Sequence, residues 1–463
     1  MKTDLIIIGS GPGGYRAAEY AAKNGLQVII FEKEYAGGTC LNCGCIPTKT
    51  LCHAATLQDK DYVRALQHKN DVVEQLRSGV EQLMSMPGIT LVRGEASFKD
   101  HNTLTCNGED YEADNIIIAT GSQAMIPPIE GIPSTLDSQS VLPSCTGGVG
   151  GGSLHSPLIV TSTELLNLDH IPGRLVVIGA GVIGMEFASI FNAFGCEVTV
   201  IEFLKECLPA TDSDIAKRLR KSLEKKGINF YLQANVKHID TEGVTFERKN
   251  KKETLSADVV LIATGRKPNI ESLNLDAAGI SYDKRGIKVD PLTFEAVRTE
   301  SAGSQHSTLD SRLFAIGDVN GQSLLAHAAT MQGIHVVNEI QGKKDNIRLD
   351  IMPAAVFTTP ETASVGLTED QCKEQEIDYT CKKGLYRANG KALAMEETEG
   401  ILKLLAAADG TILGCHILGA HAADMVQEVA ALMNFNATVQ QLRDIVHIHP
   451  TLGEILQSTA ELW

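Results

Sequence analysis

The sequence is poor in positive charge and has no long apolar run. Its 463 residues include 41 Lys and Arg against 57 Asp and Glu, a formal net charge of −16 at pH 7. Phosphate binding needs a basic field, so nucleic acid and anionic membrane surfaces are poor partners. The apolar run Leu5–Ile8 has only four residues and leads into a glycine turn. We therefore expect no membrane-spanning segment, no signal peptide and no transit peptide.

The eleven cysteines occur without a secretion signal. This favours a reducing compartment, and we expect a cytoplasmic protein. Eight of the cysteines are scattered, and each is expected to be a small buried side chain or an inert thiol. They are Cys52, Cys106, Cys145, Cys196, Cys207, Cys372, Cys381 and Cys415. The other three lie within the six residues Cys40–Cys45.

Short β-branched runs recur along the first two thirds of the chain, and helical stretches lie between several of them. Continuous apolar strands of this kind are typical of a parallel sheet covered on both faces. The predicted strands are Leu5–Ile8, Val28–Phe31, Asn115–Ala119, Leu175–Ile178, Val198–Ile201, Val259–Ala263 and Leu313–Ile316. Helices are predicted at Arg16–Asn24 and Glu186–Phe194. The pattern indicates an α/β fold.

One unit of this pattern occurs twice, in Asp4–Glu32 and Arg174–Glu202. Each copy has a strand, G-x-G-x-x-G, a helix, a second strand and a final acid 23 residues after the first glycine. The glycines let the backbone approach a pyrophosphate at a helix N-terminus, and the acid accepts hydrogen bonds from ribose hydroxyls. The sequence therefore predicts two Rossmann-like dinucleotide sites. The candidate residues are Gly9, Gly11, Gly14 and Glu32, then Gly179, Gly181, Gly184 and Glu202.

Smaller motifs add candidates for cofactor contacts. "ATG" occurs at Ala119–Gly121 and Ala263–Gly265, and Thr120, Gly121 and Gly265 are therefore candidate cofactor-binding residues. Asp318 ends the strand-like "FAIGD" and could reach a polar cofactor tail. At the second site the Glu202 carboxylate would repel a 2′-phosphate, which favours NAD over NADP, although Lys205 could soften this effect.

The chain is expected to divide into domains at changes of pattern. From about Arg348, strand-like segments precede an apolar helix, which indicates a separate α+β domain. A Gly/Ser-rich stretch, residues 144–156, reads as a linker, and Thr299–Ser311 reads as a polar surface loop. The first dinucleotide domain is expected at 1–143 and, after an interruption, at 271–347. Between these two segments we expect the linker at 144–157 and the second dinucleotide domain at 158–270. The last domain is expected at 348–463.

The segment "CLNCGC" leaves several chemistries open. Zinc needs about four ligands and the segment supplies three, so we expect no metal. A Cys40–Cys43 pair is possible because residues i and i+3 adjoin on a helix. A Cys40–Cys45 pair is wider than a helical turn and requires a distorted turn, which Gly44 would ease. The residues alone do not rank the two pairs.

The stretch "GGTCLNCGCIPTKT" resembles the redox motif of the flavin-dependent pyridine nucleotide–disulfide oxidoreductases. The resemblance covers nearly the whole chain and includes both dinucleotide motifs, "LFAIGDV", "TTPETASVGLTE" and "HIHPTLGE". It implies FAD at the first site, NAD at the second, and a redox disulfide between Cys40 and Cys45. It also implies that the last domain dimerises the chain into a homodimer.

The same resemblance assigns further roles. Spacing leaves His447 and His449 equivalent in an extended segment. The family pattern selects His449 as the base, oriented by Glu454, with a cis bond to Pro450. It further implies that Lys49 pairs with Glu186 beside the flavin. The chain departs from the family at Cys43, where an aliphatic residue is usual, and in its two long loops.

Within the family, the likeness is strongest to the members that oxidise dihydrolipoamide. It implies a lipoylated protein of a 2-oxoacid dehydrogenase or glycine cleavage complex as partner. Glutathione reduction is the alternative, although Glu202 stands where such enzymes carry basic residues. A non-catalytic dinucleotide-binding sensor would have no need of Cys40, Cys45, His449 and Glu454.

Overall fold

The computed structural model describes residues 1–133, 136, 157–299 and 311–463. It contains two compact units. The first comprises Met1–Thr50, Gln67–Met125 and Arg266–Leu349, and the second comprises Leu51–Leu66, Ile126–Gly265 and Asp350–Trp463. The expected linker at 144–156 and residues 300–310 of the expected loop lie outside the described residues.

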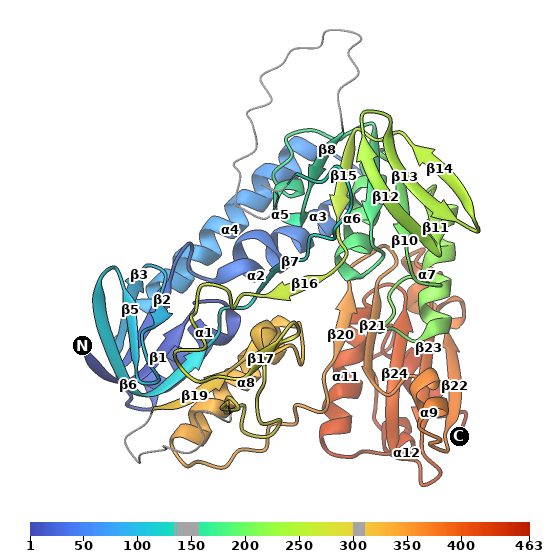
Figure 1. The fold of residues 1–463 in the computed structure, drawn as a ribbon. Helices are drawn as coiled ribbons and strands as arrows, with labels where there is room; N and C mark the ends of the chain where they lie inside the picture. Colours follow the sequence, from blue (N-terminus) through green and yellow to red (C-terminus); the bar gives the residue numbers. More distant parts are fainter. Residues whose placement is uncertain (134–135, 137–156, 300–310) are drawn as a thin grey trace. The chain divides into compact units, whose positions relative to one another are not determined.

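The first unit contains a mixed seven-stranded sheet, in which β4 and β5 extend the parallel strands in antiparallel fashion (Figure 1). Its parallel strands follow the order β3-β2-β1-β6-β19, with Ile6 opposite both Ile29 and Ile116. The central strands of this set are largely buried, as expected for a parallel sheet covered on both faces, whereas the edge strand β3 is not. The parallel strands are β1 (Lys2–Ile8), β2 (Val28–Glu32), β3 (Ile89–Arg93), β6 (Glu109–Ile118) and β19 (Arg312–Ala315).

Alternate residues of β1 enter two separate cores. Leu5 and Ile7 pack with helices α1 (Pro12–Lys23), α4 (Tyr62–Met84) and α8 (Ala326–Ile340). Ile6 and Ile8 pack with the other core, to which the antiparallel strands β4 and β5 contribute. This alternation follows from the pleat of a strand. The remaining elements here are α2 (Gly38–Cys43), the first half of α3 (Cys45–Thr56), whose residues from Leu51 belong to the second unit, β4 (Ser97–Phe98), β5 (Thr103–Cys106), β7 (Ser122–Ala124), β16 (Arg266–Pro268), β17 (Tyr282–Asp283), β18 (Gly286–Ile287) and η2 (Gly317–Asn320).

The second unit contains another parallel sheet, in the order β11-β10-β9-β15-β8. Helix α6 packs against β9 and β10 as α1 packs against β1 and β2, which reflects the sequence repeat. The elements of this part are β8 (Leu158–Val160), α5 (Ser162–Leu165), β9 (Arg174–Ile178), α6 (Val182–Ala193), β10 (Glu197–Glu202), α7 (Ser213–Lys225), β11 (Asn229–Leu232), the antiparallel β12 (Ala234–Asp240), β13 (Gly243–Arg248) and β14 (Lys251–Leu255), and β15 (Val259–Ile262).

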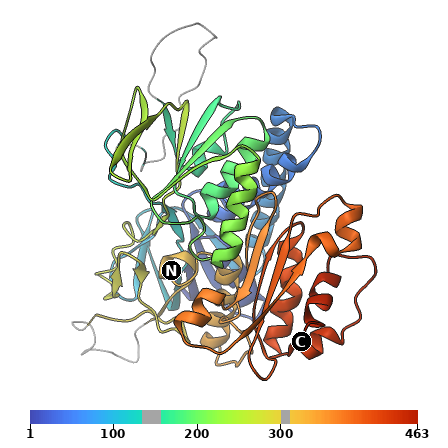
Figure 2. The same cartoon turned by 90° about the vertical axis from the view of Figure 1, so that its right-hand side faces the viewer.

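The C-terminal part of the second unit is an antiparallel sheet in the order β20-β21-β24-β23-β22 (orange to red in Figure 2). Helices α11 and α13 pack on this sheet through buried apolar side chains. Its elements are β20 (Ala354–Val356), β21 (Thr362–Gly366), α9 (Glu369–Glu374), β22 (Thr380–Leu385), η3 (Tyr386–Ala388), α10 (Gly390–Ala394), β23 (Ile401–Ala406), β24 (Ile412–Leu418), α11 (Ala422–Asn434), α12 (Val439–Arg443) and α13 (Glu454–Ala460).

The expected fold class is confirmed: two Rossmann-like parts and a C-terminal α+β part. Each predicted parallel strand coincides with an observed one to within a few residues, apart from β6, which begins earlier. Among the described residues, no helix is long and apolar enough to cross a membrane. The expected domain boundaries stay a prediction.

Candidate functional site

The first glycine turn joins β1 to α1. Gly9 has φ +101°, and a Cβ there would lie 2.5 Å from the Ala119 carbonyl oxygen. A Cβ on Gly14 would lie 1.9 Å from the Gly9 carbonyl oxygen, so only glycine lets helix and turn pack this closely. Gly11 begins the helix without a side-chain cap, and an added Cβ would meet nothing within 4 Å. The turn therefore offers an open helix N-terminus suited to a phosphate.

Glu32, at the end of β2, faces this turn and is buried. Its carboxylate accepts hydrogen bonds from the Ser10 backbone N–H at 3.0 Å and the Ser10 hydroxyl at 2.6 Å. The Glu34 backbone N–H donates to its other oxygen at 2.9 Å. These contacts fix the acid beside the turn, where the sequence predicts a ribose.

The second turn repeats this geometry between β9 and α6. Gly179 has φ +104°, with a hypothetical Cβ 2.4 Å from the Ala263 carbonyl oxygen, and a Cβ on Gly184 would lie 2.0 Å from the Gly179 carbonyl oxygen. Gly181 is again the open position. The buried Glu202 accepts from the Ala180 N–H at 2.6 Å and from the Leu204 N–H at 2.7 Å.

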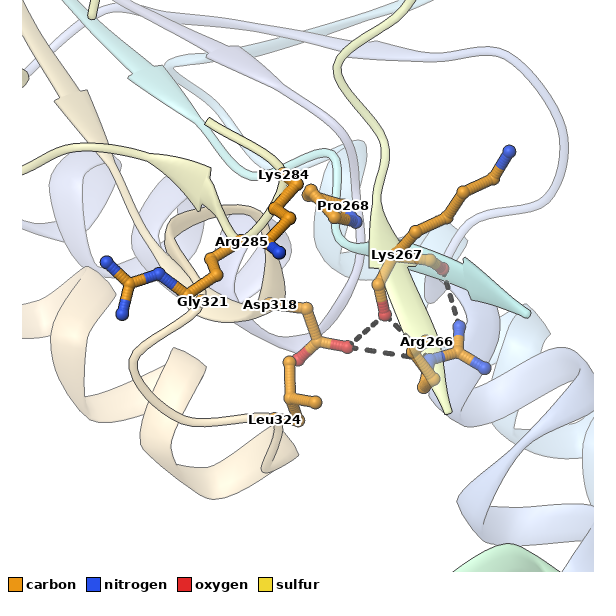
Figure 3. Close-up of a pocket in the computed structure, with 9 residues that line it drawn as sticks. Arg266, Lys267, Pro268, Lys284, Arg285, Asp318, Gly321 and Leu324 are labelled. Carbon is orange, nitrogen blue, oxygen red and sulfur yellow. Dashed lines mark hydrogen bonds and ion pairs between the residues drawn. The ribbon is translucent and has the colours of Figure 1, made fainter. Parts of the chain in front are cut away.

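Asp318 lies on η2, the short helix that follows β19, and lines a cavity of about 220 Å³ (Figure 3). It accepts a hydrogen bond from the Ser122 hydroxyl, and the Arg266 guanidinium lies 3.8 Å away. Lys267, Lys284 and Arg285 also line this cavity, so a single carboxylate faces a cationic surface.

The two "ATG" segments form tight turns. Gly121 has φ +69° and Gly265 has φ +133°, both in the region that favours glycine. The Thr120 hydroxyl donates to the Asn269 carbonyl oxygen at 2.7 Å, and the Asn269 amide donates back to the Thr120 carbonyl oxygen at 3.0 Å. In this structure Thr120 thus joins two strand ends, and its expected contact with a cofactor stays a prediction.

The thiol segment is held directly against the first glycine turn. The Gly37 N–H donates to the Ser10 carbonyl oxygen at 3.0 Å, and a Cβ on Gly38 would lie 2.8 Å from the Gly11 Cα. Within α2, the Asn42 amide donates to the Ala36 and Gly38 carbonyl oxygens, and Arg77 donates to Asn42 at 2.7 Å. These contacts position the cysteines beside the predicted nucleotide site.

Gly44 separates α2 from α3, so the chain has the distorted turn that a Cys40–Cys45 pair would require. Its backbone has φ −140° and ψ −113°, and a Cβ there would lie 2.9 Å from the Thr39 carbonyl oxygen and 3.3 Å from the Cys40 Cα. Cys40 and Cys45 therefore lie on two different helices, with their side chains in hydrogen-bond contact. Among the described residues, no group of three His, Cys, Asp or Glu could hold a metal ion.

The environment of Cys40 sets the chemistry of the reduced pair. The hydrogen bond with Cys45, followed by burial, raises the pKa of the Cys40 thiol, while the Lys49 charge opposes this rise. These effects favour the protonated form of the reduced Cys40 thiol. A thiolate is the reactive form of a thiol, so exchange between the oxidised cysteine pair and a dithiol needs a base for the incoming thiol.

A histidine–carboxylate pair lies in the second unit. The His449 Nδ1 is 2.9 Å from the Glu454 Oε1, and the His449 side chain is 80% exposed. The Thr451 N–H donates to the other Glu454 oxygen at 2.7 Å, and this bond, together with His449, lowers the pKa of Glu454. The His449–Pro450 bond is cis, as the resemblance implied. The geometry is that of a base whose ring is oriented by a carboxylate.

His447 has a different environment, because its side chain is 6% exposed and contacts Glu428 at 2.9 Å. Glu186 is buried, and its carboxylate accepts a hydrogen bond from the Phe357 N–H at 2.9 Å. Lys49 and Glu186 belong to different units, so their expected ion pair stays a prediction.

Several contributing residues were missing from the sequence prediction. Ser122, Arg266 and Asn269 hold the "ATG" turns and Asp318 in place, and the position of Ser122 and Arg266 directly after the two "ATG" motifs was a usable signal. Glu428 meets His447 only through the fold, and no local motif marks it.

Comparison with known proteins agrees with this geometry. Residues 3–333 match the pyridine nucleotide-disulphide oxidoreductase family model, and residues 352–460 match its dimerisation domain. The chain belongs to this family.

Named relatives cover the full chain. It is 36% identical to a dihydrolipoyl dehydrogenase from Geobacillus stearothermophilus, covering 100% of this chain and 96% of that one. A mitochondrial dihydrolipoyl dehydrogenase from Pisum sativum is 35% identical, with coverages of 99% and 91%. Among solved structures, the HOCl-induced flavoprotein disulfide reductase RclA from Escherichia coli superposes with a TM-score of 0.85 at 32% identity, covering 99% of each chain.

Proposed function

We propose that this protein oxidises protein-bound dihydrolipoamide to lipoamide and reduces NAD⁺, with FAD and a Cys40–Cys45 disulfide as carriers. The observation that carries the proposal is the contact of Cys40 with Cys45 across the helix break at Gly44, beside the first glycine turn. Likeness to dihydrolipoyl dehydrogenases over the full chain supports this choice of substrate.

The residues present fit both cofactors. At each turn a helix N-terminus without a side-chain cap and an open glycine leave room for a pyrophosphate, and a buried glutamate faces the same turn. We assign FAD to the turn beside the cysteines and NAD to the turn that carries Glu202. Asp318, which lines the cavity of the first unit, would bind the polar chain of FAD. A bound flavin would carry an electron pair from the cysteines to the nicotinamide.

The chain's own residues perform the thiol chemistry. His449 takes the proton from one substrate thiol, and the resulting thiolate attacks the Cys40 sulfur. The Cys40–Cys45 bond breaks, and Cys45 leaves as a thiolate. The second substrate thiol then attacks the substrate sulfur of the mixed disulfide and closes lipoamide, and its proton passes to the released Cys40 sulfur. The substrate has lost two electrons and the cysteine pair has gained them.

His449 would act on a second copy of the chain. Its ring is exposed, and it belongs to the part that matches the dimerisation domain. A two-fold homodimer would then build two sites, each with Cys40 and Cys45 from one chain and His449 and Glu454 from the other. We further propose that the partner is a lipoylated protein of a 2-oxoacid dehydrogenase or glycine cleavage complex, in the cytoplasm.

The experiment is to load the purified protein with FAD and measure NADH formation from dihydrolipoamide and NAD⁺. The expected result is turnover with NAD⁺ and much weaker turnover with NADP⁺, because the Glu202 carboxylate repels a 2′-phosphate. A flavin-loaded protein without this activity that reduces glutathione disulfide with NADPH would contradict the proposal. Binding of both cofactors without any thiol turnover would instead indicate a sensor.

A further inference from the structure

The segment between α12 and α13 carries both C-terminal histidines and has little regular structure of its own. Val446 and Ile448 are 93% and 79% exposed, whereas the His447 side chain between them is buried. His447 is therefore a point at which this stretch of chain enters the protein interior, as is Leu452 further along it.

Both ring nitrogens of His447 face oxygen atoms that can only accept hydrogen bonds. Nδ1 lies 3.0 Å from the Ile445 carbonyl oxygen, and Nε2 lies 2.9 Å from the Glu428 Oε1. A proton on Nδ1 makes the contact with Ile445 a hydrogen bond, and a proton on Nε2 lets the ring donate to Glu428 as well.

Glu428 ties this segment to a rigid element. It lies on α11, whose neighbouring residues Val426, Val429 and Ala430 are buried in the core of the C-terminal sheet. A helix packed in this way fixes the position of the Glu428 carboxylate, which in turn fixes the His447 ring.

The His447 ring also lies near the other end of the segment. A Cβ on Gly453 would lie 3.5 Å from the His447 Cδ2 and 4.0 Å from the Glu428 Oε2. Gly453 directly precedes Glu454, which orients His449. The pair thus contacts one end of the segment that presents the base, at Ile445, and lies close to the other end, at Gly453.

We propose that Glu428 and His447 form a positioning pair that holds His449 and Glu454 in the geometry needed for proton transfer from the dithiol. The pair itself takes no part in the chemistry. This inference rests on the proposed function, in which His449 is the base. A small displacement of a base from its productive position reduces a rate strongly, because proximity and orientation supply much of the rate enhancement.

Two substitutions of Glu428 test this role. Glu428→Ala removes the anchor. Glu428→Gln keeps it, because the amide N–H can donate to an unprotonated Nε2 while Nδ1–H still donates to Ile445. Asp424→Ala is the matched control, since Asp424 is a carboxylate one turn earlier on α11 with a side chain that is 88% exposed.

Flavin reduction is followed by stopped flow in the flavin-loaded dimer. With dihydrolipoamide, Glu428→Ala should lower the limiting rate by about tenfold at an unchanged half-saturating concentration. Flavin reduction by NADH should be unchanged, and Glu428→Gln and Asp424→Ala should react like the wild type. A wild-type rate in Glu428→Ala, an equal loss in Glu428→Gln, or a parallel loss with NADH overturns the proposal.

A second variant and a second readout keep the inference testable. If Glu428→Ala does not fold, His447→Asn is used in its place, and the same changes in the rates of flavin reduction are expected. The introduced Asn side chain keeps a donor for the Ile445 carbonyl oxygen but loses the contact with Glu428. If wild-type protein does not oxidise dihydrolipoamide, the proposed function is wrong, and the pair is tested by carbethoxylation mapped by mass spectrometry. His447 should be protected from the reagent in the wild type and labelled in Glu428→Ala. Equal labelling of His447 in the two proteins would contradict the contact between Glu428 and His447.

Discussion

The last two glycine positions of the second turn make separable predictions, because a side chain at Gly184 would meet packed backbone and one at Gly181 would meet open space. A Cβ on Gly184 would lie 2.0 Å from the Gly179 carbonyl oxygen, against an ordinary contact distance of 3.4–4 Å. Gly181 has φ −75° and ψ −175°, which alanine adopts easily, and an added Cβ meets nothing within 4 Å.

Gly184→Ala should therefore destabilise the fold. Overpacking of this kind costs about 1–3 kcal/mol. For a domain of this size the thermal midpoint falls by about 2–4 °C for each kcal/mol. The helix must shift away from the turn, so NAD⁺ binding falls as well.

Gly181→Ala should leave stability within about 1 kcal/mol of the wild type, because the lost N-cap preference is offset by the lower entropy of the unfolded chain. The methyl group would occupy the face that a pyrophosphate approaches. A lost charged hydrogen bond is worth about 1.5–3 kcal/mol, so the Kd for NAD⁺ should rise by about ten- to a hundredfold.

The assays are thermal unfolding of the flavin-loaded protein and titration calorimetry with NAD⁺. Wild-type NAD⁺ affinity in Gly181→Ala would refute the assignment of this turn to the pyrophosphate. Wild-type stability in Gly184→Ala would refute the packing argument.

Three further predictions concern other parts of the molecule. His449→Gln should slow flavin reduction by dihydrolipoamide by about two to four orders of magnitude, the usual contribution of a general base, with flavin content unchanged; normal turnover refutes the role of the base. Cys43→Val should keep full activity in the NADH assay, because this position is aliphatic in the family; an inactive variant would indicate that Cys43 takes part in the exchange. Lys403→Met should lower stability by about 3–5 kcal/mol in chemical denaturation, because it leaves two acids without their cation in a largely buried cluster. The Lys403 Nζ lies 2.6 Å from Asp212 and 2.5 Å from Glu369. Burial lowers the pKa of Lys403, but the contacts with these two acids outweigh burial and raise it. The stabilising effect of the contacts is therefore present at neutral pH and is lost as pH rises through the pKa of Lys403 in the folded protein. Equal stability of variant and wild type at pH 7 would contradict this reasoning.

The parallel sheets could be predicted from the sequence because strands buried on both faces must be continuously apolar, as Leu5–Ile8 and Leu175–Ile178 are. The antiparallel strand β14 could not, because its sequence "KKETL" is polar and largely exposed. Pairing with β13, rather than any apolar period, makes it a strand.

The candidate site, like the fold, could be predicted from the sequence only in part. Both glycine turns follow from local spacing, and the helix break follows from Gly44. The pairing of Cys40 with Cys45 rather than Cys43 did not follow from local physics and came from the resemblance. Glu428 lies 19 residues from His447 in the chain, so only the packing of α11 brings them together.

The most direct test of the central claim is to identify the cysteine that pairs with Cys40 in the working enzyme. The flavin-loaded protein is reduced with dihydrolipoamide, reoxidised with NAD⁺ and quenched with acid, and its peptides are mapped by mass spectrometry without reduction. The account predicts a Cys40–Cys45 disulfide that disappears on reduction and returns on reoxidation, with Cys43 as a thiol throughout. A Cys40–Cys43 disulfide that follows the same cycle would contradict it.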